Sequence, residues 1–286
     1  GQMIKGLYTS ASGMTTQMKK QDTIANNIAN VNTTGFKKSE TIMTQGKEFE
    51  IYRKEDGLDK VSPNPKTKMT KIGKLGTGVK MAENFVSHGQ GSLKETENNL
   101  DFALEGKGLF VFDTKNGLRY GRNGSLSVNN EGVLVNGNGD KLVAYDFQGN
   151  LGFVKPNDPN FSIGSDGSLI GVEIVSDIPF KTNTTGIALN LENIESPQNS
   201  VLVCEFEDLK DLQLEGDTYF YSNSQNNLTP SIATSIHQGY LENSDVSVVK
   251  EMVEMINCSR LYESNQKVLT SLDETIAKSN ELNKWT

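Results

Sequence analysis

The sequence is poor in the residues that bind metals, form disulfides or carry out acid–base chemistry. Its 286 residues include two cysteines, two histidines and one tryptophan. Cys204 and Cys258 lie far apart, so we expect neither a disulfide framework nor a zinc site, and both thiols should act as small packing residues. His88 and His237 have no sequence partner, and the acidic residues are scattered. We therefore predict that the protein is not an enzyme, with no catalytic residues, no cofactor and no metal.

Long apolar runs and a basic excess are also missing. No stretch of 18 apolar residues occurs, so no transmembrane helix or membrane insertion is expected, and the first residues lack the apolar core of a cleaved secretory signal. The net charge of −8 argues against nucleic acid as a partner. The basic run 66–80 is interpreted as a solvated linker rather than an anion site. "NGNGD" (136–140) and "GSDGS" (164–168) lack the ligand series of a calcium loop and are predicted to be β-turns.

Glycine and proline are unevenly distributed. Twenty of the 27 glycines fall between Gly46 and Gly171, whereas residues 14–34 and 240–286 contain neither glycine nor proline. Because these residues interrupt regular structure, their absence predicts long helices at both ends. Turn signals such as "KNG", "NNEG" and "GNGD" separate short apolar runs in the middle, which predicts strands at 109–112, 126–128, 133–135 and 142–145 in a β-sandwich or barrel-like domain.

Both predicted helices carry an apolar stripe. Ser247 is a good N-cap for the second helix, with Glu251 in its first turn. Its stripe repeats every seven residues and is widened by neighbours: Val248, Met255, Tyr262, Leu269 and Ile276, with Met252, Ile256, Val268 and Leu272. The first helix has a similar stripe, broken by Gln21: Ile4, Leu7, Ala11, Met14, Met18, Ala25 and Ile28. Gly6 and Gly13 are expected to weaken that helix.

The matching stripes favour a fold in which the two chain ends meet, although each helix could instead pack separately on the middle domain. The predicted fold is mainly β with long terminal helices: a β-rich middle domain and a helical coiled-coil domain formed by both ends. We expect the N-terminal half of the helical domain at 1–40, an extended connector at 41–80, the β-rich domain at 81–235 and the C-terminal half at 236–286.

Motifs at both ends and in the middle resemble one protein family. "ANNIANVNTTGFK" (25–37) closely resembles the amino-terminal signature of flagellar rod and hook proteins, and "GYLENSDVSVVKEMVEMINCSRLYESNQK" (239–267) resembles their carboxy-terminal motif. "GQGSLKETENNLDFALEGKGLFVF" (89–112) and the segment from Tyr120 to Gly132 also resemble rod proteins. Departures are modest: Leu109 stands where an aromatic is usual, Asp245 where Asn is frequent, and Cys258–Ser259 replace a pair that usually ends in Gln.

The resemblance implies a structural subunit of the bacterial flagellar basal-body rod, most similar to the distal-rod type. Such a subunit would be exported unfolded by the flagellar type III apparatus, lie outside the cytoplasmic membrane, and assemble with itself and with other axial rod and hook proteins into a tube. No small-molecule substrate is implied. The connector resembles the segment that stiffens the rod. Alternatives are a proximal-rod or other hook–basal body protein, or, from another class, a secreted carbohydrate- or wall-binding β module. A peptidoglycan-cleaving enzyme lacks a catalytic set.

The predicted subunit interface lies on the two end helices. Its asparagines are mediocre helix formers, and we interpret them as groups that hydrogen-bond to neighbouring subunits. The predicted interface residues are Leu7, Met14, Ile24, Asn26, Asn27, Ile28, Asn30, Val248, Met252, Met255, Ile256, Tyr262, Leu269 and Ile276. Because the stability of such helices comes mainly from packing, we expect them to become ordered on assembly.

Overall fold

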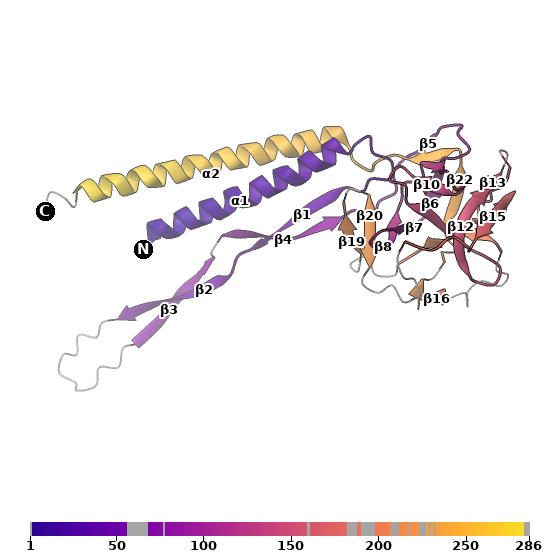
Figure 1. Cartoon of the computed structure of the whole chain (residues 1–286). Coiled ribbons are helices and arrows are strands. Elements are labelled where there is room, and N and C mark those ends of the chain that lie inside the picture. The colour runs from indigo at the N-terminus through magenta and orange to yellow at the C-terminus, as the bar shows by residue number, and fades with distance from the viewer. Residues whose placement is uncertain are drawn as a thin grey trace. The chain divides into compact units, whose positions relative to one another are not determined.

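The structure, a computed structural model, consists of two compact units (Figure 1). It describes residues 2–55, 68–76, 78–158, 161–181, 188–189, 198–206, 212–216, 218–222, 227–228, 230–231 and 233–282. The helical unit is formed by Gly1–Asn26, Ser39–Phe85 and Val249–Thr286, and the β-rich unit by Asn27–Lys38 and Val86–Val248. The chain therefore enters and leaves the β-rich unit twice. The domain boundaries expected at residues 40, 80 and 235 stay predictions.

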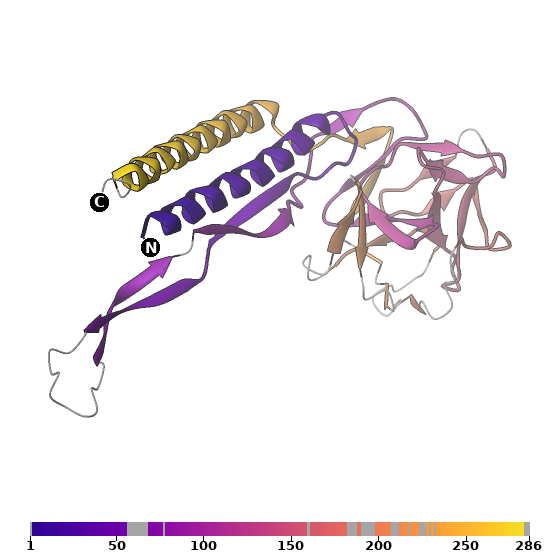
Figure 2. The same ribbon diagram turned by 60° about the vertical axis from the view of Figure 1, so that its left-hand side comes forward.

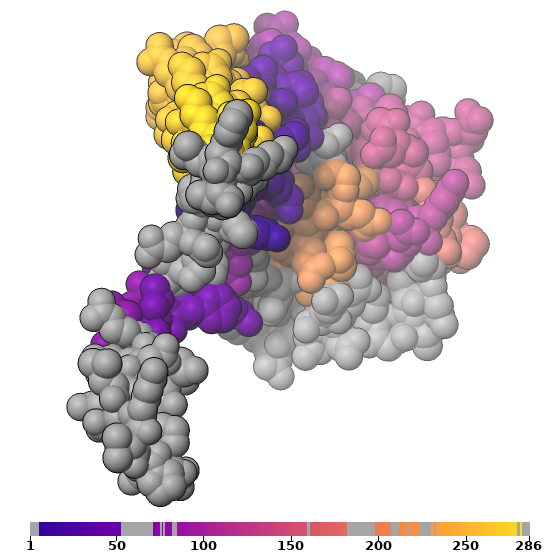
Figure 3. All heavy atoms as spheres, turned by 90° about the vertical axis from the view of Figure 1, so that its left-hand side faces the viewer, coloured from indigo at the N-terminus to yellow at the C-terminus, as the bar shows by residue number. Residues whose placement is uncertain are grey.

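Two long helices lie side by side in the helical unit (Figures 1 and 2). They are α1 (Gln2–Ala29) and α2 (Val248–Leu282), which Figure 3 shows in indigo and yellow. Ser247 directly precedes α2 and Glu251 lies in its first turn, as predicted from the capping pattern. The contacts between the helices run in opposite directions along the sequence, so the pair is antiparallel. The prediction that the chain ends meet is confirmed.

The helices approach each other at the glycines of α1. A Cβ atom added at Gly6 would lie 3.2 Å from Leu272 Cδ1, and one added at Gly13 would lie 3.1 Å from Asn265 Nδ2. The two glycines are seven residues apart, as are their partners. Further along, the Cys258 thiol donates to the Gln17 carbonyl oxygen at 3.1 Å. Gly6 and Gly13, read from the sequence as weak points, therefore permit close helix packing.

The side of α1 that contacts α2 differs from the predicted apolar stripe. Within that stripe, Ala11, Met18 and Ala25 are exposed. Apolar steps of three and four residues therefore did not select the side of α1 that packs on α2, because glycine and short polar side chains allow closer contact than methionine does. The stripe residues Leu7, Met14 and Ile28 are half-buried.

The rest of the helical unit is built from two strand pairs. β1 (Ser39–Gln45) pairs with β4 (Val79–Val86), and β2 (Glu48–Glu55) pairs antiparallel with β3 (Lys68–Gly76). α1 contacts the first pair through hydroxyl groups: Val79 N–H donates to Ser12 Oγ, and Thr23 Oγ1 lies 2.9 Å from Thr41 Oγ1. These strands occupy most of the segment that we expected to be an extended connector.

The β-rich unit contains the remaining strands and confirms the predicted β-rich middle. Their bounds are β5 Leu93–Glu95, β6 Phe102–Glu105, β7 Leu109–Thr114, β8 Gly117–Gly121, β9 Leu126–Val128, β10 Leu134–Asn136, β11 Lys141–Tyr145, β12 Leu151–Pro156, β13 Ser162–Ile163, β14 Leu169–Ile170, β15 Val172–Val175, β16 Ala188–Leu189, β17 Ser200–Val201, β18 Val203–Cys204, β19 Leu212–Glu215, β20 Tyr219–Ser222, β21 Asn227–Leu228, β22 Ser235–Gln238 and β23 Tyr240–Glu242. The four predicted strands correspond to β7, β9, β10 and β11.

The main sheet is buried on both faces. Its strand order is β15-β12-β11-β7-β8-β20-β19, with β10, β17 and β18 attached to β11 and β7, and β9 to β10. Along β7, Phe110 and Phe112 pack into one core with Leu104 and Ile236, while Leu109 and Val111 pack into a second core on the opposite face. A sheet covered on both faces needs continuous apolar strands, and the run Leu109–Phe112 supplies one.

Four tight turns of the β-rich unit share one design. They span residues 129–133, 136–140, 146–150 and 164–168, and in each the fourth residue is a glycine with positive φ. In the turn that begins at Asn136, the side-chain oxygen accepts from the N–H groups of Asn138 and Asp140. A type I turn followed by a left-handed glycine suits such short loops. The prediction of β-turns at "NGNGD" and "GSDGS" is confirmed.

Filling the glycine contact should loosen the helix pair. Gly13→Leu places a large side chain where a Cβ already meets Asn265. We expect α1–α2 packing to lose about 1–3 kcal/mol through overpacking, despite the better helix propensity of Leu. Thermal unfolding followed by circular dichroism at 222 nm measures this. Ala11→Leu, at an exposed α1 position, is the matched control. Equal melting of the two variants would contradict the close contact.

Candidate functional site

The predicted interface residues of α1 fall into different environments. Leu7, Met14, Ile28 and Asn30 are half-buried, Ile24 and Asn27 are buried, and Asn26 is exposed. The side-chain oxygen of Asn30 accepts a hydrogen bond from Thr33 Oγ1 at 3.0 Å. The asparagine run thus takes part in ending α1 within the chain. Its proposed bonds to neighbouring subunits stay a prediction.

The predicted residues of α2 divide between two faces. Val248, Met255, Tyr262, Leu269 and Ile276 are half-buried. Met252 and Ile256 are exposed, and with Val249 and Val253 they form an apolar surface at spacings of three and four residues. We call these four residues the outer face of α2. On α1, Tyr8 and Met18 are also exposed, at 73% and 52%.

The chain leaves α1 through a close contact within the β-rich unit. Gly35 has φ +69°, and a Cβ there would lie 2.5 Å from the carbonyl carbon of Arg122. Its N–H donates to the Glu242 carbonyl oxygen at 2.8 Å, and Phe36 is completely buried. The "TGFK" sequence is therefore required by the backbone approach and by the apolar site for Phe36.

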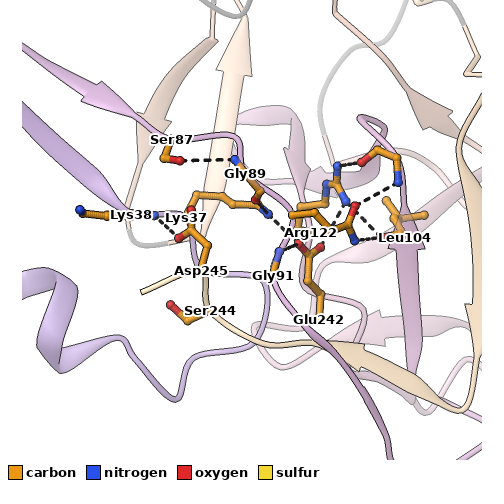
Figure 4. Close-up of polar contacts among 12 residues, drawn as sticks. Lys37, Lys38, Ser87, Gly89, Gly91, Leu104, Arg122, Glu242, Ser244 and Asp245 are labelled. Carbon is orange, nitrogen blue, oxygen red and sulfur yellow. Dashed lines mark hydrogen bonds and ion pairs between the residues drawn. The ribbon is translucent and has the colours of Figure 1, made fainter. Parts of the chain in front are cut away.

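Lys37, Arg122 and Glu242 form a buried charge cluster beside this contact (Figure 4), which we call the junction cluster. Lys37 Nζ lies 2.6 Å from Glu242 Oε1, and Arg122 Nη1 lies 3.2 Å from Glu242 Oε2. The N–H of Gly91 donates to Glu242 Oε1 at 2.8 Å. All three charged side chains are at least 97% buried. Such burial is tolerated only when the charges are paired and hydrogen-bonded.

The cations of the cluster also bind backbone carbonyl groups. Lys37 Nζ donates to the Gly89 carbonyl oxygen at 2.6 Å, and Arg122 donates to the carbonyl oxygens of Leu104 and Gly106. Burial lowers the pKa of both Lys37 and Arg122, and Glu242 opposes that effect. The cluster therefore ties the segment after α1, the linker before β5, strands β6 and β23 and the residue that follows β8 to one another.

A second layer of polar groups surrounds the junction cluster. The backbone N–H of Lys38 donates to Asp245 Oδ1 at 2.7 Å, and the N–H of Ser87 donates to the Lys38 carbonyl oxygen at 2.8 Å. His88 is half-buried, with its ring centroid 5.5 Å from that of Phe220. Burial lowers the pKa of His88, and the positive charges of Lys37 and Arg122 lower it further.

Sequence reasoning matched the members of the junction cluster to motifs but gave them no role. Lys37 follows buried Phe36, and Arg122 follows the buried pair Tyr120–Gly121. The available signal was local, because each charged residue directly follows an aromatic residue or a glycine that the fold buries. Its partner, Glu242, is 205 residues away from Lys37, so local patterns could not supply the pairing.

No membrane-spanning helix or metal cluster is found among the described residues. Within that part of the chain, no helix is both long and apolar enough to cross a bilayer. Nor do three or more His, Cys, Asp or Glu side chains gather there in a way that could hold a metal ion.

Comparisons with known proteins give a consistent result. Residues 7–37 match the family model "Flagella basal body rod protein", residues 103–189 "Flagellar hook protein FlgE/F/G D1 domain", and residues 237–282 "Flagellar basal body rod FlgEFG protein C-terminal". Each of these segments contributes one residue of the junction cluster.

Curated relatives match nearly the whole chain. Flagellar basal-body rod protein FlgG of Bacillus subtilis is 32% identical over 289 residues, covering 96% of this chain and 97% of that protein. FlgG of Buchnera aphidicola (subspecies Baizongia pistaciae) is 30% identical, covering 96% and 98%. Flagellar basal-body rod protein FlgF of Caulobacter vibrioides is 30% identical, covering 95% of each.

Substitution of Gly35 should destabilise the β-rich unit. Gly35→Ala adds left-handed strain, about 1–2 kcal/mol, and a Cβ only 2.5 Å from backbone. We expect a total loss of about 3 kcal/mol or more in urea unfolding. Gly216→Ala is the matched control, because Gly216 has the same φ of +69° with nothing within 4 Å of its Cβ position. Equal losses in the two variants would argue against the close approach.

His88 should make the β-rich unit sensitive to mild acid. Its pKa is lowered from the ordinary 6.5, so the unfolded state binds a proton more readily. Stability is therefore retained above about pH 6.5 and lost as pH falls below it towards the lowered pKa. Urea unfolding at about pH 7 and pH 5.5 measures this loss. His88→Gln should lose less stability over that interval than the unaltered chain; an identical pH dependence would contradict the assignment.

Proposed function

Since the chain belongs to the flagellar basal-body rod family, we propose that it is a rod subunit that self-assembles into a helical axial tube and transmits torque from motor to hook. The family is structural, and the chain is a basal-body protein rather than an enzyme. The main structural support for this proposal is the outer face of α2, where Val249, Met252, Val253 and Ile256 are each more than half exposed.

The outer face of α2 supports assembly because contiguous apolar surface is unfavourable in water. Tyr8 and Met18 of α1 add exposed apolar groups to the same unit. Burial of such surface in a neighbouring subunit contributes about 25 cal/mol per Å², less the entropy of ordering the side chains. Contacts that repeat head to tail without closing a ring produce a helical filament. The predicted interface residues on α1 and α2 are therefore kept as the proposed polymerisation surface, with its exposed members as the first contacts.

The helix pair supports the coiled-coil part of the prediction through its spacing. Gly6 and Gly13 face Leu272 and Asn265, which repeats the contact every seven residues on both helices. Sevenfold repetition keeps one side of a helix directed at its partner. We propose that this intramolecular pair is the unit that packs in the tube.

The strand pair β2–β3 supplies a further contact surface. Phe49 and Ile72 are 58% and 60% exposed, while Glu50 and Lys71 form an ion pair between the strands. An isolated two-stranded ribbon is marginally stable in water. We propose that this ribbon, in the segment that resembles the rod-stiffening connector, packs on neighbouring subunits.

The proposed partners are other copies of the chain, other axial rod and hook proteins, and the flagellar export apparatus, which would pass the chain unfolded. The distal rod is favoured because the sequence resembles that type most. A proximal-rod or other hook–basal body role is the alternative, since relatives named FlgF and FlhO are also 30% identical. Nucleic acid and small-molecule substrates have no part in the proposal.

A secreted carbohydrate- or wall-binding module is the alternative from another class. Glycan binding generally uses exposed aromatic side chains. Among the described residues of the β-rich unit, Phe147 is the one strongly exposed aromatic. The exposed apolar surface instead gathers on the helices and strand pairs of the helical unit, which favours a subunit of an assembly.

Charged substitutions at the exposed apolar residues of α1 and α2 should block assembly. In Ile256→Lys or Met18→Lys, a charge replaces an apolar contact, so we expect the concentration needed for filaments to rise at least about tenfold, equivalent to about 1.4 kcal/mol per contact. Ultracentrifugation and electron microscopy at increasing concentration measure this. Ser264→Lys adds the same charge at another exposed α2 position and is the control. A strain that lacks the protein but builds complete rods and hooks would refute the rod assignment.

A further inference from the structure

We propose that the two chain ends dock on the β-rich unit as one coupled event, with buried Glu242 as their shared anchor. The segments concerned are 33–38, which follows α1, and 239–245, which precedes α2. This inference concerns the folding of a single chain and is independent of the proposed rod function.

Glu242 accepts hydrogen bonds from three chain segments that are distant in sequence. Its Oε1 accepts from Lys37 and from the Gly91 N–H, and its Oε2 accepts from Arg122 (Figure 4). Its carbonyl oxygen accepts from the Gly35 N–H. Glu242 therefore contacts the segment after α1, the linker before β5 and the residue that follows β8. Because the carboxylate is completely buried, water cannot replace a partner that is lost.

The two end segments also contact each other directly. Gly35 and Lys37 bind Glu242, and the Lys38 N–H binds Asp245. If residues 33–38 leave, Glu242 loses one of its two cationic partners while Arg122 remains. The buried Glu242 carboxylate is then less fully compensated, which favours the opening of residues 239–245 to water. Conversely, loss of Glu242 leaves the Lys37 ammonium buried without a carboxylate.

The linker before β5 is held by the same arrangement. A Cβ added at Gly91 would lie 2.0 Å from the Asn243 carbonyl oxygen, so the two backbones pack without an intervening side chain. The Asn243 N–H donates to the Ser92 carbonyl oxygen at 2.9 Å, and Lys37 Nζ binds the Gly89 carbonyl oxygen. Movement of 239–245 therefore also releases residues 87–92. Three segments distant in sequence form one cooperative element.

Hydrogen exchange on the full chain tests the coupling. In Lys37→Met, amides of residues 87–92 and 239–245, as well as 33–38, should exchange at least about tenfold faster, because removing one partner of a buried ion pair shifts the opening equilibrium by more than a factor of ten. Amides of β7 and β8 should stay near their original rates. Lys115→Met, which removes an exposed positive charge, should change none of these rates.

The reciprocal variant completes the test. Glu242→Gln should accelerate exchange in 33–38, and the Lys37→Met/Glu242→Gln double variant should open less than the product of the single effects. If Lys37→Met loosens only 33–38, or the single effects multiply independently, the ends dock separately and the proposal is wrong. Should Lys37→Met disrupt β7 and β8 as well, the milder Asp245→Asn decides: faster exchange in both 33–38 and 87–92 supports coupling, and a change confined to 239–245 overturns it.

Discussion

The burial of one carboxylate constrains the β-rich unit. Glu242 is excluded from water, so its two oxygens must be satisfied by protein groups. Those groups come from the segment after α1, the linker before β5 and Arg122, which directly follows β8. No continuous piece of chain contains all three, so the interaction exists only when the two ends return to one place. Buried ion pairs contribute little net stability, but they can fix one arrangement over others.

Glycine makes the close approaches around that carboxylate possible. Gly35 and Gly91 bring backbone to within contact of backbone, at Arg122 and Asn243. Gly6 and Gly13 serve the same purpose between α1 and α2, where helix propensity alone would favour alanine. A glycine inside a helical pattern can therefore mark a contact rather than a defect. The sequence alone does not distinguish a contact from a defect, because the atom that approaches the glycine belongs to a residue far along the chain.

Features governed by neighbouring residues were predictable. The stretches 14–34 and 240–286, free of glycine and proline, indicated α1 and α2, Ser247 marked the start of α2, and the Asn–Gly turns separated β9, β10 and β11. Motif resemblance identified the structural family and its place in the basal body. The face of α1 that packs and the pairing of Lys37 with Glu242 were not predictable. Both depend on contacts across more than 200 residues, which no periodicity encodes.

The two units differ in how far the chain itself covers their apolar side chains, and this difference bears on the proposed assembly. The β-rich unit covers both faces of its main sheet and pairs its buried charges within the chain. The helical unit leaves Val249, Met252, Val253 and Ile256 in water. An isolated chain gains nothing from that exposure, whereas a repeated neighbour would bury it. For the proposed assembly, the apolar surface available for burial therefore lies in the helical unit, whereas the junction cluster fixes an arrangement of chain segments within the β-rich unit.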